Sequence, residues 1–229
     1  SFWYKIYEPF IRMAAGFGQA SIKHDKERYE HKYEYCDLLI TGSGPSGLAS
    51  AYAAAKNGAR VILAEDKPRF GGSLLTSDVN IGNQTGVEWT EKIIAELKSM
   101  PNVTVKNRSQ VFGYYDHNML VMSERISDHL PKTQKYLPKQ RLWYIRANEV
   151  LISSGSIERP LVFGNNDTPG VMLSSAAKEY MKVYGVLVGK KPLIFTNNDS
   201  GYETAIEFKK NGVNPIILDT RSNPSSDII

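Results

Sequence analysis

The chain has 229 residues, a formal net charge of +4 and 23% charged residues, which allows one large or two small domains with a sizeable core. Basic and acidic residues are interleaved, so no basic stripe is available to follow a phosphate backbone, and we expect no nucleic acid partner. The single cysteine, Cys36, excludes a disulfide framework, a paired-cysteine redox centre and a cysteine-based zinc site.

The hydropathy pattern shows no apolar run near the roughly 18 residues that a membrane span requires, so we expect no membrane partner. The start, SFWYKIYEPF, lacks the basic-then-apolar pattern of a signal peptide. Together with the lone cysteine, this predicts a cytoplasmic protein. The chain opens on Ser1 and stops just after an expected strand, which leads us to expect an internal fragment of a longer protein.

The first 35 residues combine an aperiodic apolar start with a charged, tyrosine-rich stretch, which predicts a tether or a surface wrap. From Cys36 the pattern changes. CDLLITGSG is an apolar run that enters glycines, LASAYAAAKNG is alanine-rich, and ARVILAED is a second β-branched run. This order predicts a strand, a helix and a strand.

The middle of the chain predicts one helix followed by strands. Residues 84–100 place apolar side chains near helical spacing. Strands are expected at 103–116, 118–125 and 141–155, with a polar insert at 124–140 that forms a hairpin or a loop.

The last part repeats the earlier pattern. SSAAKEYMKVYGV predicts a helix closed by Gly185, and the stretch from Lys190 to Arg221 restarts a strand, a helix and a strand. Gly47 to Gly58 and Gly201 to Gly212 are both eleven residues apart. Thr196 and Asn198 stand where the first copy has its first two glycines, so we expect this second unit to be structural.

The motif GSGPSG at 42–47 follows an apolar strand and opens an alanine-rich helix, which is the arrangement of a dinucleotide-binding turn. Gly42 permits the tight turn, Gly44 lets a pyrophosphate approach the backbone, and Gly47 lets the helix pack closely on the strand. The pyrophosphate would meet the free N–H groups at the helix start, including that of Ser46.

A carboxylate at the end of the second strand completes this pattern. Glu65 is placed to accept both hydroxyls of an adenosine ribose and to repel a 2′-phosphate, which favours NAD or FAD over NADP. Asp66 and Lys67 are expected to line the same pocket. Ser73 follows a second glycine pair, Gly71 and Gly72, like the pair with which two-dinucleotide-binding flavoproteins fold back beneath the cofactor.

These elements predict an α/β, Rossmann-like two-dinucleotide-binding fold of the FAD/NAD-linked reductase type, truncated, with an inserted β hairpin region. The expected domains are a tether at 1–35, a first dinucleotide-binding domain at 36–160 and the start of a degenerate second one at 161–229. The histidines lie among solvated charges, so no metal site is expected, and no residue is a catalytic candidate.

Six strings together resemble the alpha subunits of bacterial heterotetrameric sarcosine oxidases along nearly the whole chain. They are FWYKIYEPFIRMAAGFG, CDLLITGSGPSGLASA, FGGSLL, VFGYYDHNML, RLWYIRANEVLISSGSIERPLVFGNNDTPGVMLSSA and TNNDSGYETA. TNNDS and ERPLVF are more specific than the glycine motif. Where relatives often carry ATG, this chain has Ser153, Ser154 and Gly155.

The resemblance implies oxidative demethylation of sarcosine to glycine, hydrogen peroxide and formaldehyde, or methylene-tetrahydrofolate when folate is present. It implies NAD on this chain, held by the glycine loop with Ser46, Glu65, Asp66, Lys67 and Ser73, and by the backbone of Val111 beside the adenine. FAD and FMN, the beta, gamma and delta subunits, and a tetrahydrofolate-binding C-terminal domain are implied for the complete complex.

Two other interpretations stay open. Related subunits serve opine, proline or cyanide-forming glycine dehydrogenases, although ERPLVF and TNNDS favour sarcosine. Alternatively, the fragment is a dinucleotide-binding assembly module without turnover of its own. The glycine motif itself does not separate NAD from FAD, because both carry the ADP half that it binds.

Overall fold

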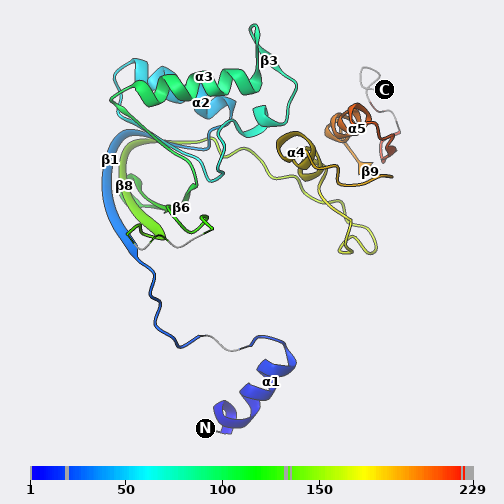
Figure 1. The fold of residues 1–229 in the computed structure, drawn as a ribbon, viewed down its shortest axis with the longest axis horizontal. Helices are drawn as coiled ribbons and strands as arrows, with labels where there is room; N and C mark the ends of the chain where they lie inside the picture. Colours follow the sequence, from blue (N-terminus) through cyan, green and yellow to red (C-terminus); the bar gives the residue numbers. More distant parts are fainter. Residues whose placement is uncertain (1, 19–20, 132–133, 135, 223, 225–229) are drawn as a thin grey trace.

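A six-stranded sheet in the order β5-β2-β1-β8-β7-β6 forms the centre of the computed structural model (Figure 1). The structure describes residues 2–18, 21–131, 134, 136–222 and 224. Four short elements lie between the main ones: η2 (Gly72–Leu75), β3 (Asn80–Ile81), β4 (Gln84–Thr85) and η3 (Asp116–Asn118). β3 and β4 pair in a separate two-stranded sheet.

The first strand, helix and strand form as predicted. β1 (Tyr29–Thr41) leads into α2 (Pro45–Lys56) and then β2 (Val61–Ala64), which lies parallel to β1. Next comes α3 (Gly86–Ser99), whose start is fixed by a capping box between Thr85 and Glu88. β5 (Val103–Lys106) then pairs in parallel with β2. This confirms the Rossmann-like α/β fold.

β2 is buried along its whole length, and the second half of β1 is largely buried, which accounts for the apolar sequences of these two segments. Ile40 and Leu63 face α2 and α3 in one core cluster. Their neighbours Leu39 and Ile62 face the opposite way and pack with Met122 of β7 in a second cluster. The turn after β1 is therefore held between two packed layers.

The antiparallel half of the sheet consists of β6 (Ser109–Tyr115), β7 (Met119–Arg125) and β8 (Gln140–Ile152). The single strand expected at 103–116 is wrong, because the chain turns at Asn107 and Arg108 between β5 and β6. Arg108 has a φ of +50°, and the chain passes there from parallel pairing with β2 to antiparallel pairing with β7. The insert between β7 and β8 is a loop in its described residues; 132, 133 and 135 lie outside them.

The N-terminal segment carries a helical stretch, η1 (Trp3–Tyr7) and α1 (Glu8–Ala14), with no buried residue. It lies apart from the sheet in Figure 1. The expected tether at 1–35 needs correction, because residues 29–35 are the first half of β1 and pair with β8. Arg141 binds Glu30 at 3.0 Å across these strands. Ion pairs of this kind let charged residues form a strand that hydropathy does not reveal.

The second unit also forms as predicted. α4 (Ser174–Tyr184) ends at Gly185, which has a φ of +65°. β9 (Leu193–Thr196), α5 (Ser200–Lys210) and β10 (Ile216–Asp219) follow, and the two strands pair in parallel. Residues 223 and 225–229 lie outside the described part. Of the helices that the structure describes, none is both long and apolar enough to cross a membrane.

Candidate nucleotide-binding site

The glycine turn lies at the carboxyl ends of β1, β2 and β8, where open α/β sheets bind ligands. The Gly42 N–H donates to Ala64 O at the end of β2 at 2.8 Å. From the other side, the Ser153 N–H donates to Thr41 O at 2.9 Å, and its hydroxyl donates to Gly42 O at 3.2 Å. The small-residue turn that begins at Ser153 therefore forms one wall of this site.

Two of the three glycines are required by the fold itself. Gly42 has a φ of +98°, and a Cβ there would lie 2.4 Å from Ser153 O. A Cβ on Gly47 would lie 2.0 Å from Gly42 O. Gly44 differs, because nothing lies within 4 Å of its Cβ position. No side chain caps α2, so a pyrophosphate at Gly44 would not have to displace a capping group from the helix start.

Glu65 is buried at the end of β2, and three protein donors bind its carboxylate. Oε2 accepts the main-chain N–H of Ser43 at 2.9 Å and its hydroxyl at 2.5 Å. Oε1 accepts the N–H of Lys67 at 3.0 Å. Burial raises the pKa of Glu65, and the neighbouring Asp66 carboxyl raises it further, while these donors lower it. Ser43, completely buried, was missed by the sequence analysis; its position between two glycines was the available signal.

The second glycine pair contacts the first glycine loop. The Gly71 N–H donates to Ser43 O at 3.1 Å, and a Cβ on Gly72 would lie 2.9 Å from the Cα of Gly44. Gly71 and Gly72 both have a positive φ, of 121° and 53°. Ser73 follows on η2 and is exposed. The chain therefore folds back against the turn in which the pyrophosphate is expected.

The other predicted residues differ in how they relate to Glu65. The exposed Asp66 lies next to it. Lys67 donates its N–H to Glu65, but its side chain forms an ion pair with Glu179 of α4 at 2.9 Å. Val111 pairs with Met122 and packs on the core of the sheet. Ser109, two residues before Val111, donates its N–H to the main-chain oxygen of Glu65 at 2.8 Å. This bond brings the start of β6 to the site.

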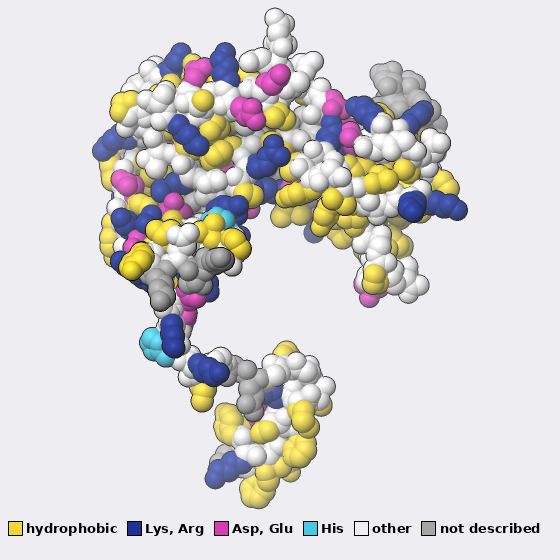
Figure 2. Space-filling view, viewed as in Figure 1, with side chains coloured by type: hydrophobic (Ala, Val, Ile, Leu, Met, Phe, Trp, Pro, Cys, Tyr) yellow, Lys and Arg dark blue, Asp and Glu magenta, His cyan; other side chains and the backbone are white. Residues whose placement is uncertain are grey.

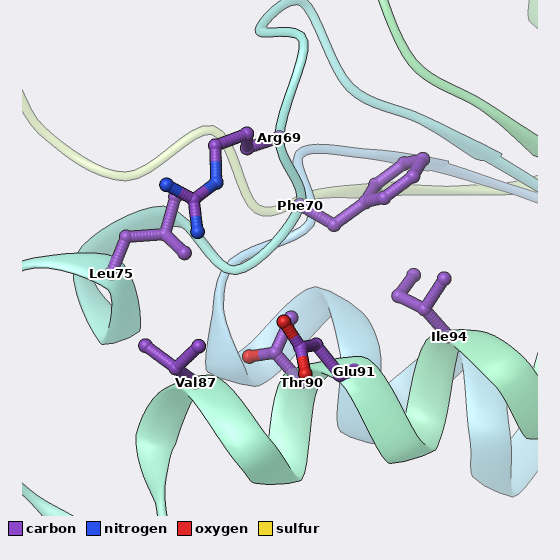
Figure 3. A pocket seen from close by; sticks show the side chains of 7 residues that line it. All are labelled: Arg69, Phe70, Leu75, Val87, Thr90, Glu91 and Ile94. Atoms are coloured by element: carbon purple, nitrogen blue, oxygen red, sulfur yellow. The ribbon is translucent and has the colours of Figure 1, made fainter. Parts of the chain in front are cut away.

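A small pocket of about 160 Å³ lies between the segment around Arg69 and Phe70 and helix α3, and no residue of the GSGPSG turn lines it (Figure 3). Figure 3 shows Arg69 and Phe70 above it and α3 below it, with Thr90 and Glu91 among its lining residues. A volume of this size holds a benzene-sized molecule. It is too small for an adenosine, so we do not assign the nucleotide to it.

The second glycine loop is filled by its own side chains. Thr196 Oγ1 donates to Asn198 O at 2.8 Å and accepts its N–H at 3.2 Å. Asn198 Oδ1 in turn accepts the N–H of Ser200 at 3.0 Å, at the start of α5. These groups take the positions in which a pyrophosphate would meet the backbone. The geometry therefore supports a structural second unit.

The acidic residue of the second copy is also occupied. Asp219 corresponds to Glu65, and its carboxylate accepts three hydrogen bonds from the Arg221 guanidinium and one from the main-chain N–H of Arg221. The Tyr202 hydroxyl donates to it at 3.1 Å. The Arg221 bonds hold the pKa of Asp219 well below its usual range. An adenosine ribose would have to replace this guanidinium.

A groove of about 1210 Å³ is lined by residues of the second unit, by residues 156–160 of the segment that leads into it, and by Ser73, Thr76 and Ser77. Figure 2 shows hydrophobic side chains gathered on the surface of the second unit. Met172 and Leu193 line the groove and are exposed. Among the described residues, no group of three or more His, Cys, Asp or Glu side chains is placed to hold a metal ion.

Comparison with known proteins gives one family match and several relatives. Residues 37–131 match the family model described as FAD dependent oxidoreductase. The sarcosine oxidase alpha subunit of Rhizobium meliloti (strain 1021) is 46% identical over 220 residues, which cover 96% of this chain and 22% of that protein. The corresponding subunit of Corynebacterium sp. (strain P-1) is 36% identical, over 92% of this chain and 22% of its own length.

More distant matches come from both sequence and structure. An opine oxidase subunit of Agrobacterium tumefaciens (strain Ach5) is 26% identical, over 83% of this chain and 38% of its own length. Among solved structures, L-proline dehydrogenase from P. horikoshii superposes with a TM-score of 0.67 at 22% identity, covering 88% of this chain and 38% of that one. Thioredoxin reductase from Lactococcus lactis gives a TM-score of 0.55 at 18% identity, covering 84% and 59%.

These comparisons agree with the strings identified in the sequence. The chain spans about a fifth of the length of the sarcosine oxidase subunits that it matches. Over that stretch it is similar in sequence to the alpha subunits of sarcosine oxidase, and it has the Rossmann-like fold of the FAD- and NAD-linked oxidoreductases.

Proposed function

We propose that this chain is the NAD-binding core of an oxidoreductase subunit that acts in the oxidative demethylation of sarcosine. The products of the complete complex are glycine, hydrogen peroxide and formaldehyde, or methylene-tetrahydrofolate. The support is the similarity to sarcosine oxidase alpha subunits over 96% of the chain. The beta, gamma and delta subunits, FAD, FMN and tetrahydrofolate belong to that complex, and its proposed location is cytoplasmic.

The observation that carries the nucleotide proposal is the buried Glu65 beside an open glycine turn. The carboxylate is placed by Ser43 and Lys67, and the Cβ position of Gly44 opens into free space. The ribose would bind Glu65, and the pyrophosphate would lie against Gly44 and Ser46 at the start of α2. Asp66, Lys67, Ser73 and the backbone of Val111 complete the proposed contacts.

The residues of this chain contribute binding and orientation. A nicotinamide dinucleotide supplies hydride transfer when it is bound. Glu65 would hold the adenosine ribose, and the N–H groups at the start of α2 would donate hydrogen bonds to the diphosphate. We assign no catalytic role to any residue of the chain. The amine is oxidised elsewhere in the proposed complex.

FAD is the second candidate ligand, because residues 37–131 match a family of FAD dependent oxidoreductases. FAD carries the same ADP half, so Glu65 and the glycine turn fit it equally well. In that case the chain would be the flavin-binding part of a related amine, opine or proline dehydrogenase. A non-catalytic assembly module would bind either nucleotide without turnover.

The deciding experiment is to denature the purified protein and identify the released nucleotide by mass spectrometry, before and after incubation with NAD and with FAD. Release of NAD would support the proposal. Stoichiometric FAD would favour the second candidate. Release of neither nucleotide after both incubations would contradict nucleotide binding at Glu65.

A further inference from the structure

Three ion pairs connect the first unit to the second. The Lys67 ammonium donates to both carboxylate oxygens of Glu179 on α4 at 2.9 Å. Asp78 binds Lys182 of α4 and, at 2.5 Å, Lys210 of α5. Between these ion pairs, α4 packs against η2. The second unit is thus bound at two separate places along the first.

Both places lie within segments that form the nucleotide site. Lys67 is two residues beyond Glu65 and donates its N–H to that carboxylate at 3.0 Å. Asp78 follows the turn in which the Ser77 N–H donates to Ser73 O at 3.0 Å. Movement of α4 relative to the first unit would therefore pull on both the ribose side and the pyrophosphate side of the site.

The Asp78 pair belongs to a network rather than standing alone. An isolated exposed ion pair contributes little to stability. Lys182, however, is only 14% exposed and also lies 3.4 Å from Glu207 of α5. Hydrogen bonds from Lys182 and Lys210 lower the pKa of Asp78 to about 2, so the carboxylate is ionised at neutral pH. The network thus joins four charged side chains from three segments: Asp78 after η2, Lys182 of α4, and Glu207 and Lys210 of α5.

We propose that Asp78 and Glu179 are positioning residues that fix both loops of the nucleotide site against the second unit, so that nucleotide binding and docking of the second unit stabilise each other. This rests on the proposed function. Such coupling is reciprocal: whatever affinity the docked unit gives to the nucleotide, the nucleotide gives to docking. The structural second unit would then serve the first by holding its loops.

The first test is a titration of the full chain with NAD. The Asp78→Asn/Glu179→Gln variant keeps the shape of both side chains and removes their charges. We expect its dissociation constant for NAD to rise by about five-fold, the lower end of common coupling strengths. Its affinity should also depend less on salt than that of the wild type. Glu203→Gln is the matched control, because Glu203 binds Lys178 at 2.5 Å within the second unit and should leave the affinity unchanged.

The second test measures docking directly, by the distance between spin labels on Lys92→Cys in α3 and Lys209→Cys in α5. Cys36 is buried and its thiol pKa is raised to about 12, so it should stay unlabelled. We expect a broader distance distribution in the double variant, and a narrower one in the wild type when NAD is added.

The two ways of failing are distinguishable. If the wild type binds NAD but the double variant shows the same affinity and the same distances, the coupling is overturned and the proposed function stands. If the wild type binds neither NAD nor FAD, the proposed function is overturned, and the coupling with it.

Discussion

Glu65 and Ser43 form a buried pair in which one carboxylate oxygen accepts both the main-chain N–H and the hydroxyl of Ser43, at 2.9 and 2.5 Å. The other oxygen accepts the N–H of Lys67. A carboxylate has about four acceptor positions, so these donors leave about one free. A ribose that donates two hydroxyls would therefore replace the hydroxyl of Ser43.

Replacing Glu65 by glutamine should weaken dinucleotide binding by about 1–3 kcal/mol, since a charge-assisted hydrogen bond to the ribose is lost. Isothermal titration calorimetry measures this directly. The matched control is Asp219→Asn in the second copy, where Arg221 and Tyr202 already occupy the carboxylate. Equal affinity of Glu65→Gln and the wild type would contradict the role of Glu65.

Replacing Ser43 by alanine should separate folding from binding. The variant loses the hydroxyl bond to a buried carboxylate, so its free energy of unfolding without nucleotide should fall by about 1 kcal/mol. The affinity for NAD should stay the same or increase, because the ribose no longer has to replace that hydroxyl. Urea unfolding and calorimetry on the same samples test this. A loss of affinity as large as that of Glu65→Gln would mean that the hydroxyl remains bound in the complex.

The pH dependence of stability should show the raised pKa of Glu65. Because burial raises this pKa, the native state binds the proton more tightly than the unfolded state does. The contribution of Glu65 to stability therefore decreases as pH rises from its ordinary pKa through its raised pKa in the native state. We expect the unfolding free energy of the wild type, minus that of Glu65→Gln, to fall as pH rises above the ordinary carboxyl range and then to level off once Glu65 is ionised in both states.

The carboxyls of Asp37 and Asp78 have lowered pKa values of about 2 and contribute in the opposite sense, toward lower stability in acid. They are present in both proteins and cancel in the difference. A difference that rises with pH would show that the donors from Ser43 and Lys67 outweigh burial, and that the pKa of Glu65 is lowered.

Two glycine-to-alanine changes should affect different properties, one the affinity for NAD and the other the stability of the fold. Gly44→Ala places a methyl group in open space at a φ of −66°, so its melting temperature should match the wild type. Its NAD binding should weaken by about 1–3 kcal/mol, because the methyl group stands where the pyrophosphate meets the N–H groups. Gly42→Ala should instead lower stability by about 1–3 kcal/mol or more, because of its positive φ and its contact with Ser153 O.

Thermal unfolding with and without NAD separates these two cases. If Gly44→Ala bound NAD as tightly as the wild type, the pyrophosphate would not lie at this turn. If Gly42→Ala kept the wild-type melting temperature, the loop would have relaxed away from Ser153.

The sequence by itself determined the features that depend on local chemistry. Strand, helix and strand with GSGPSG at 42–47 follow from the pattern of apolar residues and glycines, and the end of α4 follows from Gly185. Glu65 at the end of β2 follows from spacing alone. The equal spacing of the second unit, with Thr196 and Asn198 in the places of glycines, was also readable from the sequence. Each of these depends on residues near one another in the chain.

Only the tertiary structure decided which distant groups meet. Residues 29–35 form a strand because β8, more than a hundred residues later, pairs with them. Lys67 turns to Glu179 across a separation of 112 residues, and Ser43 reaches Glu65 across 22. Pairing edges, ion pairs and buried acceptors are set by the packing of whole elements, and spacing along the chain does not encode that packing.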